Sequence, residues 1–257
     1  MRGAIVALAF TAVFSAAASA AADGLSDLAF RPNPGAPLPL AVVLKDEQGR
    51  AVPVGWYFTG EPVVLVLQYL RCRTLCGLTL RNVIDAVEVL PLRPGRDFRL
   101  LAIDIDPHDT PADALRARQQ YLGGRRNAGA EDGIHFLTGE EAVVRAVADA
   151  VGFPFRYDAA TEQYLHPAGF IVATPDGTVS RYFFGIGASP AELQQGLADA
   201  AAGNGIGPLA RFLLLCRGDG ATGRYTLAVL AVLTAADLGA AGVVVALFAV
   251  IRRRRRR

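Results

Sequence analysis

Apolar residues recur along the chain with two different periods, and the alternation between the two predicts an α/β fold. Residues 63–69 form a continuous apolar run, which is typical of a strand buried on both faces of a sheet, and the mostly apolar residues 98–105 predict a second buried strand. Between them, apolar residues fall near helical spacing until Pro91, which is expected to end the helix. The three segments therefore predict a strand, a helix and a second strand at the centre of a parallel sheet.

The same alternation continues on both sides of this unit. Pro111 stands where a helix would begin, and Thr138 with Glu141 has the spacing of a capping box at the start of another helix. The predicted elements are a small hairpin from 41–44 and 52–58, helices over 111–122, 139–151 and 190–201, a strand over 134–137, and a hairpin from 169–174 and 178–184. This order is that of a thioredoxin-like α/β fold with an N-terminal hairpin extension, which we assign to a domain of residues 40–202.

The N-terminal part of the chain has the composition of a targeting segment. Residues 1–22 contain one early arginine, an apolar run and a small-residue end, which is the pattern of a cleavable secretory signal peptide. An uncleaved membrane anchor is the alternative. Residues 23–39 carry four prolines and are expected to form an extended lead-in without regular structure.

Residues 226–251 predict one C-terminal transmembrane helix. Their single charged residue, Asp237, costs about 2.5–3.5 kcal/mol at mid-bilayer, and the surrounding apolar side chains outweigh that cost. Asp237 could instead mark a polar contact between helices. Six arginines at 252–257 would form a cytoplasmic tail. The domain and a juxtamembrane linker of residues 203–225 would then lie on the periplasmic or extracytoplasmic side of the plasma (inner) membrane.

Composition narrows the classes of function. The chain is 52% hydrophobic and 19% charged, which excludes a disordered protein. The formal net charge is +2, but without Arg2 and the arginines at 252–257 only 19 basic residues remain against 24 acidic ones. Because a nucleic-acid binder needs a basic surface on its folded part, no nucleic-acid partner is expected.

Cys72 and Cys76 lie where the first buried strand passes into the following helix. A thiol at a helix N-terminus favours the thiolate form, which is both a nucleophile and a soft metal ligand. A disulfide between the two would close too short a loop to add much stability. Three intervening residues, rather than the two of thioredoxins, leave room for a metal, and Cu(I) prefers thiolates with imidazole. Cys216 is expected to be buried, with a membrane-proximal intermolecular disulfide as the alternative.

The three histidines of the chain are the candidates for a third copper ligand. His166 precedes the predicted strand at 169–174, in the loop that faces the cysteine helix of a thioredoxin-like sheet, and is the best candidate. His108, which follows the second buried strand, and His135, in a short strand, remain alternatives.

The chain resembles the Sco/SenC family of thioredoxin-like proteins, which are associated with copper delivery to cytochrome oxidase. The resemblance covers about residues 38–202. It rests on the cysteine spacing, on Ile-Asp-Ile-Asp-Pro-His-Asp-Thr-Pro at 103–111, on His-Phe-Leu-Thr-Gly at 135–139, and on the place of His166 before Pro175-Asp-Gly. It implies that Cys72, Cys76 and His166 bind one copper ion, as Cu(I) or Cu(II). Family members usually have a proline after the first cysteine and often one after the second, where this chain has Arg73 and Gly77.

The resemblance implies a metallochaperone that passes copper to an oxidase subunit without turnover. The alternative is an enzyme, a membrane-tethered thiol–disulfide oxidoreductase acting on another exported thiol protein. In it Cys72 would attack the partner's disulfide and Cys76 would resolve the mixed disulfide. His166-Pro167 would then resemble the cis-proline dipeptide that borders thioredoxin active sites. A copper or redox sensor fits the same residues.

Overall fold

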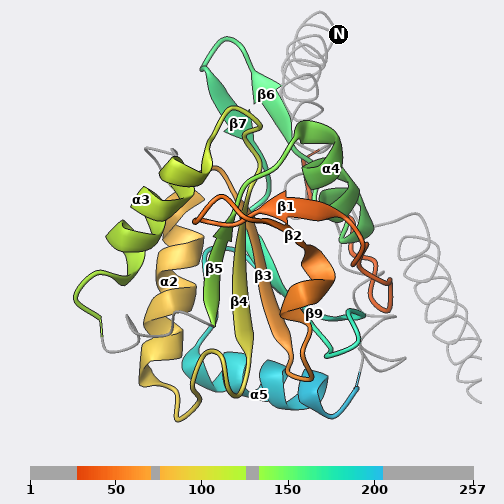
Figure 1. Cartoon of the computed structure of the whole chain (residues 1–257). Coiled ribbons are helices and arrows are strands. Elements are labelled where there is room, and N and C mark those ends of the chain that lie inside the picture. The colour runs from red at the N-terminus through yellow and green to blue at the C-terminus, as the bar shows by residue number, and fades with distance from the viewer. Residues whose placement is uncertain (1–27, 71–75, 126–132, 205–257) are drawn as a thin grey trace, which may run out of the picture. The chain divides into compact units, whose positions relative to one another are not determined.

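A five-stranded sheet in the order β5-β4-β3-β8-β9 forms the centre of the molecule (Figure 1). The computed structural model describes residues 28–70, 76–125 and 133–204, which belong to a compact unit spanning Asp27–Pro208. Strands β3, β4 and β5 run parallel, and β8 and β9 are antiparallel to their neighbours. Their bounds are β3 (Val63–Gln68), β4 (Arg99–Asp104), β5 (Ile134–Leu137), β8 (Gly169–Ala173) and β9 (Val179–Phe184).

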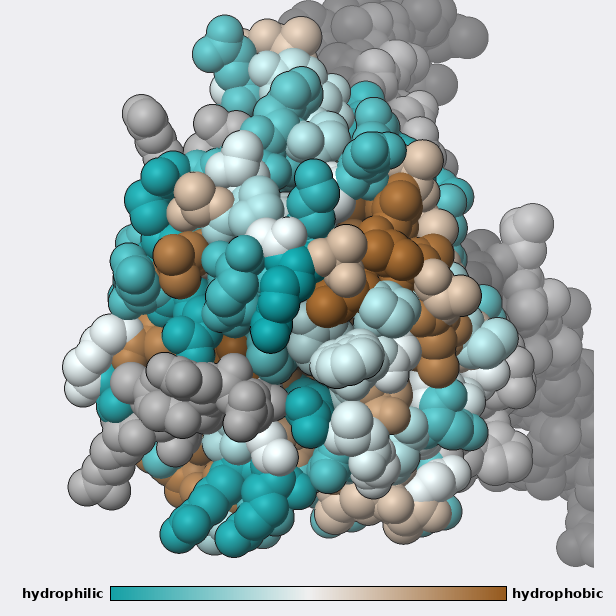
Figure 2. Space-filling model, in the orientation of Figure 1, coloured by the Kyte–Doolittle hydropathy of each residue, from teal (hydrophilic) through white to brown (hydrophobic). Residues whose placement is uncertain are grey.

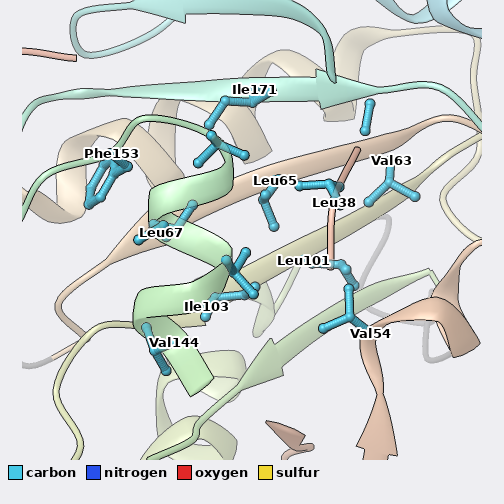
Figure 3. Close-up of a cluster of buried hydrophobic side chains, with 14 of the residues drawn as sticks. Leu38, Val54, Val63, Leu65, Leu67, Leu101, Ile103, Val144, Phe153 and Ile171 are labelled. Atoms are coloured by element: carbon cyan, nitrogen blue, oxygen red, sulfur yellow. The ribbon is translucent and has the colours of Figure 1, made fainter. Parts of the chain in front are cut away.

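The two faces of the sheet are covered by different helices. Val64 and Val66 of β3 belong to a core shared with α2, α3 and α5, whereas Leu65 and Leu67 belong to a core shared with α4 and the N-terminal elements. Figure 3 shows the second core, where Leu67 lies near Val144 of α4. Because both faces are buried, β3 is apolar along almost its whole length. The helices are α2 (Cys76–Val89), α3 (Pro111–Leu122), α4 (Glu141–Ala150) and α5 (Pro190–Ala201).

The mixed α/β architecture is as predicted, and α3, α5 and β5 have the predicted bounds. The N-terminal hairpin differs in its second arm. It pairs β1 (Val43–Lys45) with β2 (Ala51–Pro53), after which the chain forms a 3-10 helix, η1 (Val54–Tyr57), instead of a strand to residue 58. Val54 and Tyr57 are both buried. Their spacing of three places them on one side of a helical turn, whereas a strand would have turned them to opposite faces.

The capping box predicted at Thr138 is wrong. The main chain of Thr138 exchanges hydrogen bonds of 2.8 and 2.9 Å with Lys45 of β1, and α4 begins later, at Glu141, without a side-chain cap. A capping box is present at α5, where the Glu192 N–H donates to Ser189 Oγ over 3.3 Å and the Ser189 N–H donates to Glu192 Oε2 over 2.9 Å. A strand contact between distant residues therefore overrides the local signal at Thr138.

A second small hairpin, absent from the sequence-based prediction, precedes β8. It consists of β6 (Arg156–Asp158) and β7 (Gln163–Leu165) at the top of Figure 1. Its residues are half-buried or exposed, so the segment lacks the apolar pattern that marks a strand in sequence. The hairpin leads the chain directly to His166.

The described part of the lead-in, residues 28–39, contains no helix or strand and contributes to the core. The Leu38 N–H donates to the Gly177 carbonyl over 2.8 Å, and the Leu38 side chain is buried beside β3. The predicted signal peptide (1–22), the transmembrane helix (226–251), the arginine tail and Cys216 lie outside the described residues. Within the described ranges, no helix is both long enough and apolar enough to cross a membrane.

Candidate copper and thiol site

The cysteine segment lies at the carboxyl end of β3. Cys76 is the first residue of α2, while its side chain and all of Cys72 lie outside the described residues. A 14-residue helix places the positive end of its dipole and its unpaired N–H groups at this N-terminus. A helix N-terminus of this kind generally favours the thiolate form of a cysteine.

The chain around His166 lies beside the chain that leads into the cysteine segment. The rings of Tyr69 and Tyr164 are in contact, with centroids 5.6 Å apart. Strand β8 pairs with β3 in a register that, continued past the strand ends, sets position 166 opposite position 70. The fold thus brings His166 to the end of β3 from which Cys72 and Cys76 follow.

His166 has the protonation and tautomer of a metal-binding imidazole. Burial lowers its pKa, and a hydrogen bond to the Pro167 carbonyl offsets this only in part, so the ring is neutral near pH 7. Nδ1 lies 2.9 Å from the Pro167 oxygen and must carry the proton to donate to it. Nε2 is buried and has no hydrogen-bond partner among the described residues. A neutral ring held through Nδ1, with the Nε2 lone pair unused, fits a copper ligand.

The peptide bond before Pro167 is trans, because no cis peptide bond occurs in the described part of the chain. The expected resemblance of His166-Pro167 to a thioredoxin cis-proline is therefore wrong. The Pro167 carbonyl instead orients the imidazole, and no sequence pattern indicated this contact.

The other two histidines lie elsewhere. The His108 side chain is 80% exposed and its Nδ1 lies 2.8 Å from Asp106 Oδ1. His135 is buried in β5, where its ring packs on Tyr57 with centroids 4.6 Å apart. The described residues, which exclude both cysteine side chains, contain no group of three metal-ligating side chains. Of the three histidines, only His166 lies directly before β8, the strand that pairs with β3.

A pair of buried carboxyl groups lies beside Leu70, the last described residue before the cysteine segment. Asp104 ends β4, and its Oδ1 accepts hydrogen bonds from the Leu70 N–H over 3.3 Å and from the Asp106 N–H over 3.1 Å. Burial raises the pKa of Asp104 well above its usual value, and a hydrogen bond and the negative charge of Asp109 raise it further. The aspartates of residues 103–111 could have indicated a functional site from sequence alone, because a carboxyl group in a buried strand needs hydrogen-bond partners.

Gly77, which follows the second cysteine, stands where a larger residue would meet α3. A Cβ at position 77 would lie 2.7 Å from the Tyr121 hydroxyl of α3. This hydroxyl donates to the Gly77 carbonyl over 3.4 Å. A side chain at position 77 would therefore have to displace the Tyr121 hydroxyl.

We expect Gly77→Ala to lower the free energy of unfolding by about 1–2 kcal/mol, because overpacking exceeds the gain in helix propensity. In a Tyr121→Phe background, which lacks the obstructing oxygen, the same change should be neutral or stabilising. Urea unfolding of the four proteins of this double-mutant cycle measures the difference. An equal cost in both backgrounds would show that Tyr121 is not the obstacle.

Solved structures share this fold. A putative electron transfer protein from Aquifex aeolicus VF5 is 24% identical with a TM-score of 0.59, and the match covers 67% of this chain and 96% of that chain. Arabidopsis thaliana ScoI with copper bound is 16% identical with a TM-score of 0.50, covering 66% and 98%. BsSco, described as having a disulfide switch and as a member of the Sco family of cytochrome c oxidase assembly proteins, is 18% identical with a TM-score of 0.50, covering 66% and 97%.

These structures are too distant in sequence to show which family the chain belongs to, and a family model shows it instead. No curated protein matches the sequence. The model of the SCO1/SenC family matches residues 42–202, which is more than half of the chain and includes Cys72, Cys76 and His166. The resemblance first drawn from the cysteine spacing and from His166 is thereby confirmed, and this chain belongs to the SCO1/SenC family.

Proposed function

We propose that this chain is a membrane-anchored copper metallochaperone that aids copper insertion into cytochrome c oxidase. The observation that carries the proposal is the state of His166, a neutral imidazole whose Nε2 is buried and has no hydrogen-bond partner among the described residues. Together with the thiolates of Cys72 and Cys76 it would hold one copper ion as cargo. Two thiolates and one imidazole suit Cu(I).

Delivery follows from ligand exchange rather than turnover. A three-coordinate ion at the edge of a sheet can accept a ligand from a partner before it loses one of its own. The copper-receiving subunit of an oxidase is the partner that we propose, since BsSco is described as belonging to a family of oxidase assembly proteins and ScoI of Arabidopsis is known with copper bound.

The proposed location is the outer face of the plasma (inner) membrane. A signal peptide at 1–22 would export the domain, and a single helix at 226–251 followed by the cytoplasmic arginines would hold it there. Copper sites of oxidases that face the same compartment would then be within reach of the anchored domain.

A thiol–disulfide oxidoreductase without copper is the second candidate, and the position of Cys76 at the start of α2 favours it. In this reaction the Cys72 thiolate attacks a disulfide of the partner and expels one partner thiolate. Cys76 then attacks the mixed disulfide, which leaves Cys72 and Cys76 joined and the partner reduced. His166 has no necessary part in these steps, so its replacement distinguishes the two functions.

The test is an anaerobic Cu(I) titration of the reduced full-length chain against a competing chelator, in a Cys216→Ser background that leaves only two thiols. We expect one copper per chain, no binding after Cys72→Ser with Cys76→Ser, and an affinity at least about 100-fold lower after His166→Ala. His108→Ala is the matched control and should bind as tightly as the parent, because that side chain is 80% exposed and its Nδ1 lies against Asp106.

If copper binds equally well with and without His166, or does not bind, the chaperone proposal fails. Loss of binding in His166→Ala with unchanged reduction of a model disulfide would support the chaperone over the oxidoreductase. The reverse pattern would support the oxidoreductase.

A further inference from the structure

The outer face of the β1–β2 hairpin is mostly apolar. In this hairpin Val43 pairs with Pro53, and Lys45 pairs with Ala51. These four residues are exposed, whereas Leu44 between them is buried in the core. Because side chains alternate along a strand, the four lie on one face, and three of them are apolar. The solvent face of an antiparallel sheet is normally polar, so this composition indicates a contact surface.

Trp56 of η1 adds an exposed aromatic ring beside this hairpin. It is 69% exposed and is the only tryptophan of the chain. A hollow of about 620 Å³ is lined by Trp56 together with Arg50, Val52 and Thr59, so the indole adjoins β2. Figure 2 shows pale and brown side chains over the part of the molecule where Figure 1 places β1 and β2. The hairpin face is here defined as Val43, Lys45, Ala51, Pro53 and Trp56.

The exposed charges of residues 41–60 are all positive. Lys45 is exposed, and the Arg50 side chain is 67% exposed. The two acidic residues of the same segment, Asp46 and Glu47, are 0% and 3% exposed. Apart from its terminal arginines, the chain carries more acidic than basic residues. The hairpin therefore presents a positive surface on a domain that is acidic on average, and its charge complements that of an anionic surface.

We propose that the hairpin face docks on the surface of a bilayer that contains acidic phospholipids. Tryptophan rings gather at the level of the lipid headgroups, where their amphipathic character fits both environments. The apolar side chains of the face enter the same region, and Lys45 and Arg50 contact lipid phosphates. The inference rests on the proposed membrane anchoring, which would keep a bilayer within reach of the domain.

Docking at Trp56 is compatible with copper transfer. The hollow beside Trp56 also reaches Arg99, the first residue of β4, whereas Asp104 near the cysteine segment is the last. The two ends of this strand are roughly 17 Å apart. The indole therefore lies toward the end of the sheet away from the proposed copper site, and we expect docking to leave the Cu(I) affinity unchanged.

The test uses the fluorescence of Trp56 in the full-length chain, because no other tryptophan contributes to the signal. The chain is reconstituted into vesicles of phosphatidylcholine alone, or of phosphatidylcholine and phosphatidylglycerol in equal parts. Both kinds contain a lipid with a nitroxide quencher on its headgroup. We expect stronger quenching of Trp56 in the acidic vesicles than in the neutral ones. Salt at about 1 M should reverse the difference, because it shortens the Debye length to about 3 Å.

Variants locate the docking surface. Lys45→Gln should lower the ratio of docked to undocked protein about fivefold, which is the effect of one basic residue near acidic lipids. Arg116→Gln on α3 is the matched control, since it also removes one exposed positive charge but lies outside the hairpin face. Trp56→Phe combined with Tyr157→Trp moves the reporter to β6, where the parent tyrosine is 54% exposed. Acidic lipid should not increase the quenching of that tryptophan.

Equal quenching of Trp56 in neutral and acidic vesicles would overturn the proposal, as would unchanged quenching in Lys45→Gln. Shielding of Trp56 that rises with protein concentration and not with acidic lipid would also overturn it, because a second copy of the chain would then cover the face. Flotation with neutral vesicles tests the membrane anchor separately. Cu(I) affinity in Lys45→Gln should equal that of the parent, so a failure of the chaperone proposal is distinguishable from a failure of docking.

Discussion

Replacing Phe153 by alanine is expected to lower the free energy of unfolding by about 3–5 kcal/mol, the usual cost of removing a buried phenylalanine ring. Phe153 is 1% exposed and packs edge-on against Phe30, with ring centroids 5.3 Å apart. It follows α4, where its N–H donates to the Ala148 carbonyl over 2.8 Å. The ring thus joins α4 to the N-terminal segment. Urea unfolding measures the loss.

The same change should alter His166, because the Phe153 ring lies 5.4 Å from the imidazole. Burial lowers the pKa of His166, so admitting water beside the ring should raise that pKa toward its ordinary value. An NMR titration of His166 measures this shift. Phe153→Leu fills most of the space and should cost less than about 1.5 kcal/mol, with little change in the pKa.

Val89→Ala, on the exposed side of α2, is the control and should change stability by at most about 0.5 kcal/mol. If Phe153→Ala cost no more than this control, the aromatic contacts would not stabilise the N-terminal segment. If the protein lost stability with no change in the titration of His166, the burial of the imidazole would come from other neighbours.

Replacing Asp104 by asparagine is expected to remove a loss of stability that the parent shows as the pH rises. The folded pKa of Asp104 is raised, so its contribution to stability is full below the unfolded pKa of about 4 and is lost as the pH rises through the folded pKa. Each pH unit over which only the folded chain keeps the proton costs about 1.4 kcal/mol. The asparagine Oδ1 can still accept from the Leu70 N–H, and its amide can donate to Asp109 as the protonated acid does.

Unfolding free energies measured from pH 4 to pH 8 test this prediction. Asp158→Asn is the control with the opposite sign, because a hydrogen bond from Thr161 lowers the pKa of this exposed carboxylate. Its contribution is present above the unfolded pKa and is lost as the pH falls, so it should not flatten the profile above pH 4. An unchanged decline with pH in Asp104→Asn would mean that Asp104 is ionised in the folded protein.

Local patterns were sufficient for the order of elements and for the candidate ligands. The apolar run of β3 and the prolines that begin α3 and α5 act on the chain within a few residues, so their effects are visible in sequence. The place of Cys76 at the start of α2 is local in the same sense. The position of His166 at the same end of β3 as the cysteines is not a local property, because it comes from the pairing of β8 with β3.

Two of the failures have one physical cause, which is contact between residues far apart in the chain. Thr138 carries a capping signal but pairs with Lys45, and residues 54–57 turn into η1 because Val54 and Tyr57 enter the same core. Segment β6–β7 carries too little apolar pattern to be recognised.

The sequence by itself determined the α/β order, the cysteine pair and the family resemblance, because these depend on spacing along the chain. Only the tertiary structure decided the chemical state of His166, the raised pKa of Asp104, and the hollow beside Trp56. Each of these depends on burial and on hydrogen-bond partners, and folding alone determines which distant groups exclude water from one another.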